Sequence, residues 1–217
     1  MPSKVNYIGF AGTDSYDLIL YLAAMLTTSK RKVLLADNSR RKALSFCIPV
    51  SGTEGSERKE ISYKGMEFRL DMSAEPQEGW DYVLVDFGQN VNHEGIKACD
   101  TLFLVTDTGL HNMAAIEPLG AKFRNIYLLL REIPGGLEEN YIHKLLQEKG
   151  LEEKKSYYFY LDGGDREAMT ALQYNNSLCY RKLSPAVKYF IQDILKEVFE
   201  LEENEIKLAE KELKRRH

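Results

Sequence analysis

Short, almost uninterrupted apolar runs recur along this chain and are separated by helix-like segments. The runs lie at residues 5–10, 31–37, 80–88, 100–107 and 125–132. Runs of this kind are typical of strands buried on both faces of a sheet, and such strands form parallel sheets joined by crossover helices. The pattern therefore predicts an α/β domain in which a mostly parallel sheet lies between two layers of helices.

The segments between the runs show helical spacing. Residues 17–26 place Leu18 and Leu22 on one side of an amphipathic helix, and residues 111–123 and 141–150 are also expected to be helical. Residues 38–48 are expected to form a short helix, residues 51–59 an exposed loop, residues 156–162 a further strand, and the sequence around Lys64–Gly65 a hairpin of two short strands.

From Ser184 onward the sequence predicts one long helix with a proline in its first turn. Glu203 and Lys207 form one of several oppositely charged pairs four residues apart that would support its last part. We expect a single domain at residues 1–200 and a charged helical extension at residues 201–217. The extension would project from the domain, either solvated or as a short coiled coil, and would serve as a protein–protein arm.

Composition narrows the class of protein. The 217 residues are 44% hydrophobic and 29% charged, with a net charge of −4, which is ordinary for a globular protein and gives no global sign of nucleic-acid binding. The three cysteines contain no C-x-x-C pair, which favours reduced thiols. No apolar stretch approaches the ~18 residues of a membrane span, and Met1 leads directly into a strand-like run. We therefore expect a soluble, cytoplasmic protein without membrane insertion.

Polar side chains follow several of the predicted strands. Asp37, Asp86 and Asp107 each come at the end of an apolar run, and the small-residue turn at 9–17 follows the first run. In open α/β sheets the carboxyl ends of the strands share one edge, and ligands bind there. We expect these groups to meet at that edge.

The order of elements resembles that of the MinD/ParA family of deviant Walker-A P-loop ATPases, from residue 5 to about residue 199. The helix sequence YLAAML at 21–26 is similar to the family's NLAAAL, and it aligns the family's KGGVGKTT loop without a gap to FAGTDSYD at 10–17. KVLLAD and DYVLVDFG resemble the family's second strand and its Walker-B strand. The resemblance implies a three-layer, doubly wound P-loop NTPase-like fold with a long C-terminal helix.

The resemblance also implies roles for individual residues. Asp37 matches the acid that helps to position the attacking water, and Asp86 matches the acid that holds magnesium through water. The nucleotide-binding set that the resemblance carries over is Gly12, Thr13, Asp14, Ser15, Tyr16, Asp37 and Asp86.

Several positions depart from the family pattern. Ser15 stands where the phosphate-binding lysine belongs, Tyr16 replaces the threonine that ligates magnesium, and Phe10 replaces the second signature lysine. Asp14 replaces a glycine and places negative charge where a triphosphate would sit. Leu130 aligns with the asparagine that reads adenine. We therefore expect the set to be vestigial, with no efficient hydrolysis, no catalytic residue, no metal site and no required cofactor.

Structural roles are an alternative for the same residues. Asp37 and Asp86 would cap the turns that follow their strands, and Asp14 or Ser15 would cap the helix that begins at residue 17. Residual binding of ATP or ADP with magnesium through backbone N–H groups and the helix N-terminus stays open as the competing interpretation.

The sequence thus favours a MinD/ParA-like pseudo-ATPase that acts as a scaffold, localisation factor or regulator. The family's atypical TadZ/CpaE-type members, which localise pilus or secretion machinery, are the most similar in style. Two alternatives are a nucleotide-binding switch and a DNA-partition adaptor, for which residues 40–42 and 214–216 are the only basic clusters. Protein partners are expected, among them a second copy of the chain in a nucleotide-independent homodimer.

Overall fold

The computed structural model of the chain describes residues 5–49, 60–69, 79–120, 123, 125–137, 139–148 and 152–215. Within these residues it contains one eight-stranded sheet in the order β3-β4-β2-β5-β1-β6-β7-β8, parallel throughout except for the β3–β4 pair. The strands are β1 (Asn6–Gly12), β2 (Val33–Asp37), β3 (Glu60–Tyr63), β4 (Met66–Arg69), β5 (Tyr82–Gly88), β6 (Thr101–Thr106), β7 (Ile126–Ile133) and β8 (Lys155–Tyr160).

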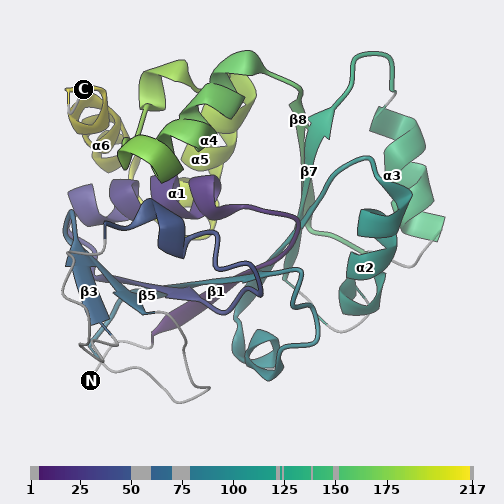
Figure 1. Cartoon of the computed structure of the whole chain (residues 1–217), viewed down its shortest axis with the longest axis horizontal. Coiled ribbons are helices and arrows are strands. Elements are labelled where there is room, and N and C mark those ends of the chain that lie inside the picture. The colour runs from purple at the N-terminus through teal and green to yellow at the C-terminus, as the bar shows by residue number, and fades with distance from the viewer. Residues whose placement is uncertain are drawn as a thin grey trace.

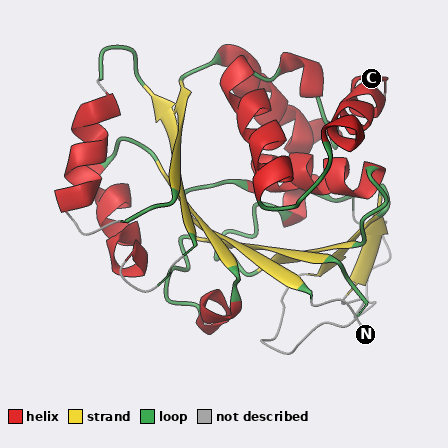
Figure 2. Ribbon diagram, turned by 180° about the vertical axis from the view of Figure 1, so that it is seen from behind, coloured by secondary structure: helices red, strands yellow, loops and turns green. Residues whose placement is uncertain are grey.

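Helices cover both faces of this twisted sheet (Figure 1). One face carries α1 (Tyr16–Thr28), α4 (Gly163–Asn175), α5 (Pro185–Glu197) and α6 (Glu203–Arg215), and the other carries η2 (Glu94–Ala98), α2 (Leu110–Gly120) and α3 (Glu139–Glu148). Two short 3-10 turns, η1 (Ser45–Cys47) and η3 (Tyr180–Lys182), complete the elements. The view from behind in Figure 2 shows the same three layers, so the predicted doubly wound fold is confirmed.

The local predictions held for the strands and less well for the helices. The predicted buried runs became β1, β2, β5, β6 and β7, and the hairpin around Lys64–Gly65 became β3 and β4. The short helix expected at 38–48 is reduced to the single turn η1. The loop expected at 51–59 lies outside the described residues.

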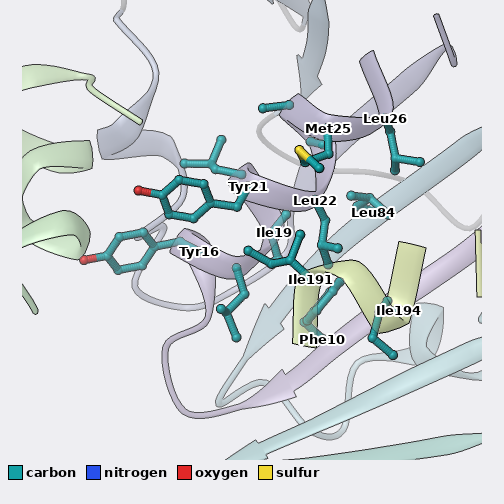
Figure 3. Close-up of a cluster of buried hydrophobic side chains, with 14 of the residues drawn as sticks. Phe10, Tyr16, Ile19, Tyr21, Leu22, Met25, Leu26, Leu84, Ile191 and Ile194 are labelled. Atoms are coloured by element: carbon teal, nitrogen blue, oxygen red, sulfur yellow. The ribbon is translucent and has the colours of Figure 1, made fainter. Parts of the chain in front are cut away.

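Helix α1 is buried on every side, which differs from the amphipathic helix that the sequence predicted. Every residue of 16–26 is buried, including Leu20 and Ala23, which lie off the predicted apolar side. A helix that is apolar all round requires a cover on each side. Figure 3 shows part of this packing, with Leu22 directed toward Ile191 of α5.

Helix α6 supplies the missing cover. The single long helix expected from Ser184 is two helices, because the chain turns between Glu197 and Glu203 with Glu200 in the left-handed region at φ +53°. Helix α6 returns onto α1 and buries Ile206, Ala209 and Leu213 in the same core. The prediction that residues 203–215 project beyond the domain was therefore wrong.

Side chains from β5 and from the segment before β2 contact this turn. The Tyr82 hydroxyl donates to the Phe199 carbonyl oxygen at 2.9 Å, and the two rings meet edge to face with centroids 5.0 Å apart. At the start of α6, Arg31 forms an ion pair with Glu205 at 3.3 Å.

Candidate functional site

The loop between β1 and α1 is pressed against the neighbouring strand β6. Gly12 has φ +123°, and a Cβ atom there would lie 1.9 Å from the Val105 carbonyl oxygen. The Thr13 backbone N–H donates to that same oxygen at 2.8 Å. The close approach of this loop to β6 is therefore enough to explain why residue 12 is a glycine. The Thr13 N–H is already hydrogen-bonded to a carbonyl oxygen of the sheet.

Ser15 begins helix α1 without capping it through its side chain. It occupies the N-cap position, as expected, but its hydroxyl makes no capping hydrogen bond. The Ser15 oxygen is buried and has no hydrogen-bond partner among the described residues. The prediction of a side-chain cap at this position was wrong.

The two aromatic residues that replace family residues both belong to the core. Phe10 is fully buried and stacks on Phe103 with ring centroids 4.7 Å apart. Tyr16 is 5% exposed, its hydroxyl lies 3.5 Å from the Met169 carbonyl oxygen, and burial raises the pKa of its phenol. Figure 3 shows both side chains among the apolar residues around α1. Their sizes and positions serve packing.

A buried ion pair joins the first turn of α1 to strand β7. The Arg131 guanidinium donates to both carboxylate oxygens of Asp17 at 2.7 Å, and it also donates to the Asp14 carbonyl oxygen at 3.1 Å. The two side chains are only 11% and 5% exposed. Burial is the largest single influence and lowers the pKa of Arg131, but the charge and hydrogen bonds of Asp17, together with the charges of nearby acids, raise the pKa overall. Planar, bidentate pairs of this kind are the strongest arginine contacts.

The Asp37 carboxylate fastens the loop that follows β2. Its Oδ1 accepts from the Ser39 N–H and hydroxyl at 3.1 and 2.5 Å, and its Oδ2 accepts from the Ser45 N–H and hydroxyl at 3.1 and 3.0 Å. The Lys42 ammonium donates to the Asp37 carbonyl oxygen at 2.5 Å. These contacts are those of a capping residue.

Asp86 lies beside Asp37 on the adjacent strand β5. Burial, followed by the Asp37 charge, raises the pKa of Asp86 to about 8, although the Gly88 N–H donates to its Oδ1 at 2.9 Å and opposes that shift. In the absence of a bound cation, a carboxyl with such a pKa is mainly protonated at neutral pH. The described residues contain no group of three or more acidic, histidine or cysteine side chains able to hold a metal ion.

A polar cavity of about 290 Å³ opens at this edge of the sheet. Each arginine at the cavity is paired with an acid: Arg131 with Asp17, and the exposed Arg41 with Asp14 at 3.6 Å. The residues around it are Thr13, Asp14, Arg41, Gln89, Asp107, His111, Asn112, Arg131, Glu132 and Met169. Of the predicted set, Thr13 and Asp14 line the cavity, whereas the lining does not include Gly12, Ser15, Tyr16, Asp37 or Asp86.

Among the described residues that line the cavity, both arginines are paired with acids, and neither lysine of the family pattern occurs at residues 10–17. In the part of the chain that the structure describes, the cavity lining therefore offers a triphosphate no cation that is free of an acidic partner. Arg131 was missed by sequence reasoning, although a basic residue ending an apolar strand was a usable signal, and Arg41 was considered only as part of a basic cluster.

A second cavity lies at the opposite end of the strands. It measures about 740 Å³ and is bounded by η2 and by residues that precede β6 and β7, among them Cys99, Asp100 and Asn125. Because ligands of such sheets bind at the carboxyl ends of the strands, its size does not make it the candidate site.

Comparison with solved structures places this geometry in a known fold. The chain superposes on a ParA family ATPase from Chlorobium tepidum with 15% identity and a TM-score of 0.57, covering 86% of this chain and 98% of that one. The MinC:MinD cell division complex of Aquifex aeolicus shows 12% identity and a TM-score of 0.66, with 91% of this chain and 96% of the other chain covered. The complex of a Cyanothece McdA variant with ATP shows 11% identity and a TM-score of 0.65, with 93% of this chain and 98% of the other chain covered. The fold is that of the ParA and MinD ATPases.

This likeness concerns architecture, since all three identities are below 16%. No protein-family description matches the sequence, and no curated protein matches it either. Among the residues that the structure describes, none of the helices combines the length and hydrophobicity that crossing a bilayer requires. The expected resemblance is thus confirmed for the fold, and the chemistry must be argued from the site itself.

Proposed function

We propose that this ParA/MinD-fold protein does not hydrolyse nucleotide and acts through protein partners, as a scaffold, localisation factor or regulator of a bacterial assembly. The observation that carries the proposal is the Arg131–Asp17 ion pair, which takes the buried cation of the site into an internal contact. Without a free cation, a triphosphate would meet the Asp107 carboxylate and an Asp14 carboxylate whose charge is offset only by the exposed Arg41. Pilus or secretion machinery is the assembly that we propose, because the altered loop resembles that of TadZ/CpaE-type proteins.

Protein partners are consistent with the relatives. One of the matched structures is a complex of MinD with MinC, in which the fold binds another protein. A second copy of this chain is a further proposed partner, through an interface that does not depend on nucleotide.

The DNA-adaptor alternative has weaker support. Two of the three basic residues at 40–42 are engaged within the chain, since Arg41 is paired with Asp14 and Lys42 donates to the Asp37 carbonyl oxygen. In the second cluster, Lys214 is paired with Glu210 at 3.3 Å. Phosphate binding to DNA requires several free lysines and arginines on one surface.

Isothermal titration calorimetry with ATP and ADP, each with and without magnesium, tests the proposal. We expect no binding tighter than about 10 µM, because that affinity corresponds to roughly 7 kcal/mol that the paired arginines cannot supply. Light scattering on the same samples should show an oligomeric state that nucleotide does not change. Tighter binding, or dimerisation that requires ATP, would instead establish the nucleotide-dependent switch.

A further inference from the structure

We propose that the Asp17 carboxylate is the internal occupant of an oxyanion site, and that it holds Arg131 in the way that the oxyanion of a ligand would. The inference rests on the proposed function and deepens it. The β1–α1 loop is tied to β7 without a nucleotide because the chain supplies its own anion, the Asp17 carboxylate. The contact is then an autoinhibitory one, because an external oxyanion must displace Asp17 to reach the guanidinium.

The geometry is that of anion recognition. Two parallel N–H···O contacts of 2.7 Å join the guanidinium to the carboxylate, which is the fork-to-fork arrangement by which arginine binds carboxylates and phosphates. The partners are 114 positions apart in the chain, so the contact bridges two separate elements. A third contact, from Arg131 to the Asp14 carbonyl oxygen at 3.1 Å, fixes the loop itself to β7.

The position of Asp17 adds a second feature of an anion site. Asp17 lies in the first turn of α1, where the partial positive charge of the helix N-terminus favours an anion. It also aligns with the last residue of the family's phosphate-binding loop. The carboxylate therefore uses both the guanidinium and the helix end, the two groups that would otherwise be offered to a phosphate.

The surroundings explain why the intact chain should not take an external anion. Arg131 is neutralised by Asp17, Arg41 is opposed by Asp14, and the Glu132 carboxylate beside the cavity is paired with Arg166 at 2.8 Å. Asp107 brings a further negative charge to the cavity wall. An anion entering the cavity would gain no unpaired cation.

Removing the internal carboxylate should convert the site into one that accepts external oxyanions. The Asp17→Ala variant leaves a buried guanidinium without its partner and opens space for a carboxylate-sized group. Because Arg131 also lines the cavity, an external anion can approach the guanidinium from that side. Acetate and inorganic phosphate are small oxyanions that fit the arginine fork, and both can be used as probes.

The experiment is a thermal-unfolding series on the full chain in sodium acetate, sodium phosphate and sodium chloride at equal ionic strength. Asp17→Ala should lower the Tm in chloride by roughly 10 °C, as the loss of one partner of a buried pair does in a chain of this size. Acetate or phosphate should then raise the variant's Tm in a saturable way, by roughly 3–5 °C at ten times its Kd. The Tm of the wild type should show no saturable rise in acetate or phosphate and should change only by the general salt effect.

Two further variants separate an anion site from a general salt effect. Asp17→Asn fills the space with an amide and should show no saturable rescue. The double variant Asp17→Ala with Arg131→Met removes the guanidinium and should also lose the rescue. Equal anion responses in the single and double variants would overturn the proposal, as would a wild type that responds as strongly as Asp17→Ala.

A folding assay covers the case in which Asp17→Ala is insoluble. The variant would be refolded from urea with and without phosphate, and recovery of folded protein only with phosphate supports the proposal. Equal recovery, or none in either buffer, overturns it. Failure here leaves the proposed function intact, whereas ATP binding by the wild type defeats that function without bearing on the rescue.

Discussion

Replacement of Asp86 by asparagine should stabilise the protein, and the gain should be larger at pH 8 than at pH 5. Burial and the Asp37 charge raise the pKa of Asp86 from 3.8 to about 8 in the folded protein. Between these two values the folded chain keeps a proton that the unfolded chain has released. Its contribution to stability is therefore complete below about pH 4 and is lost as the pH rises through 8.

The size of the effect follows from linkage. The unfolding free energy falls by about 1.4 kcal/mol per pH unit wherever the folded state binds one more proton than the unfolded state. From pH 5 to pH 8 this gives a loss of roughly 3–4 kcal/mol in the wild type. The asparagine side chain carries no titrating proton and can still accept the Gly88 N–H, so the variant should lack this slope.

Urea unfolding followed by the fluorescence of the single tryptophan, Trp80, measures both proteins at pH 5, 6, 7 and 8. The stability difference between the variant and the wild type should grow by roughly 3–4 kcal/mol from pH 5 to pH 8. Asp86→Ala is the control: it also removes the slope but should be less stable than the asparagine variant at every pH, because the Gly88 N–H loses its acceptor. A variant with the wild-type slope, or one that is less stable than wild type at pH 8, would refute the reasoning.

Two further substitutions test the packing of the fold by chemical denaturation. Gly12→Ala should lower the free energy of unfolding by more than about 3 kcal/mol, because φ is positive and the new Cβ would meet the Val105 carbonyl oxygen. The control is Gly135→Ala, whose new Cβ would meet nothing within 4 Å and which should be nearly neutral. Similar losses of stability at both positions would contradict the close approach of β1 to β6. Leu213→Ala should lower the free energy of unfolding by roughly 2–4 kcal/mol, because Leu213 is fully buried. Leu208 on the same helix is 64% exposed, and Leu208→Ala should cost less than about 0.5 kcal/mol. A small effect at Leu213 would mean that α6 does not pack on α1.

The strands were predictable because their signal is local. A run such as 80–88 must be buried on both faces to hide its apolar side chains, and that alone identifies a parallel sheet. The course of the C-terminus was not predictable in this way. The turn at Glu200 contains no glycine or proline to mark it, and helical spacing continues across it. What decides the turn is tertiary: α1 has an apolar outer face that only a returning helix can cover.

The candidate site failed to be predictable for a related reason. In the sequence, the loop has Ser15 in place of a lysine and a carboxylate at Asp14. Both features indicate only that phosphate binding is weakened. The gain lies in a pair of residues that no local pattern connects, Asp17 in the first turn of α1 and Arg131 within strand β7.

The two changes make sense as one. Arg131 without an anionic partner would be a buried unpaired charge, which costs several kcal/mol. A buried Asp17 carboxylate without Arg131 would carry the same penalty. Asp17 and Arg131 together avoid both penalties and keep the β1–α1 loop tied to β7. On this argument the fold retains the closed loop as a permanent feature of its surface, and partners would recognise one constant shape. Amide hydrogen exchange should then show the same protection at Thr13 with and without ATP, since its N–H is bound to the Val105 carbonyl oxygen in either case. Protection that rises on adding ATP would mean that the loop opens and closes, and the ion pair would then be a gate and not a fixed contact.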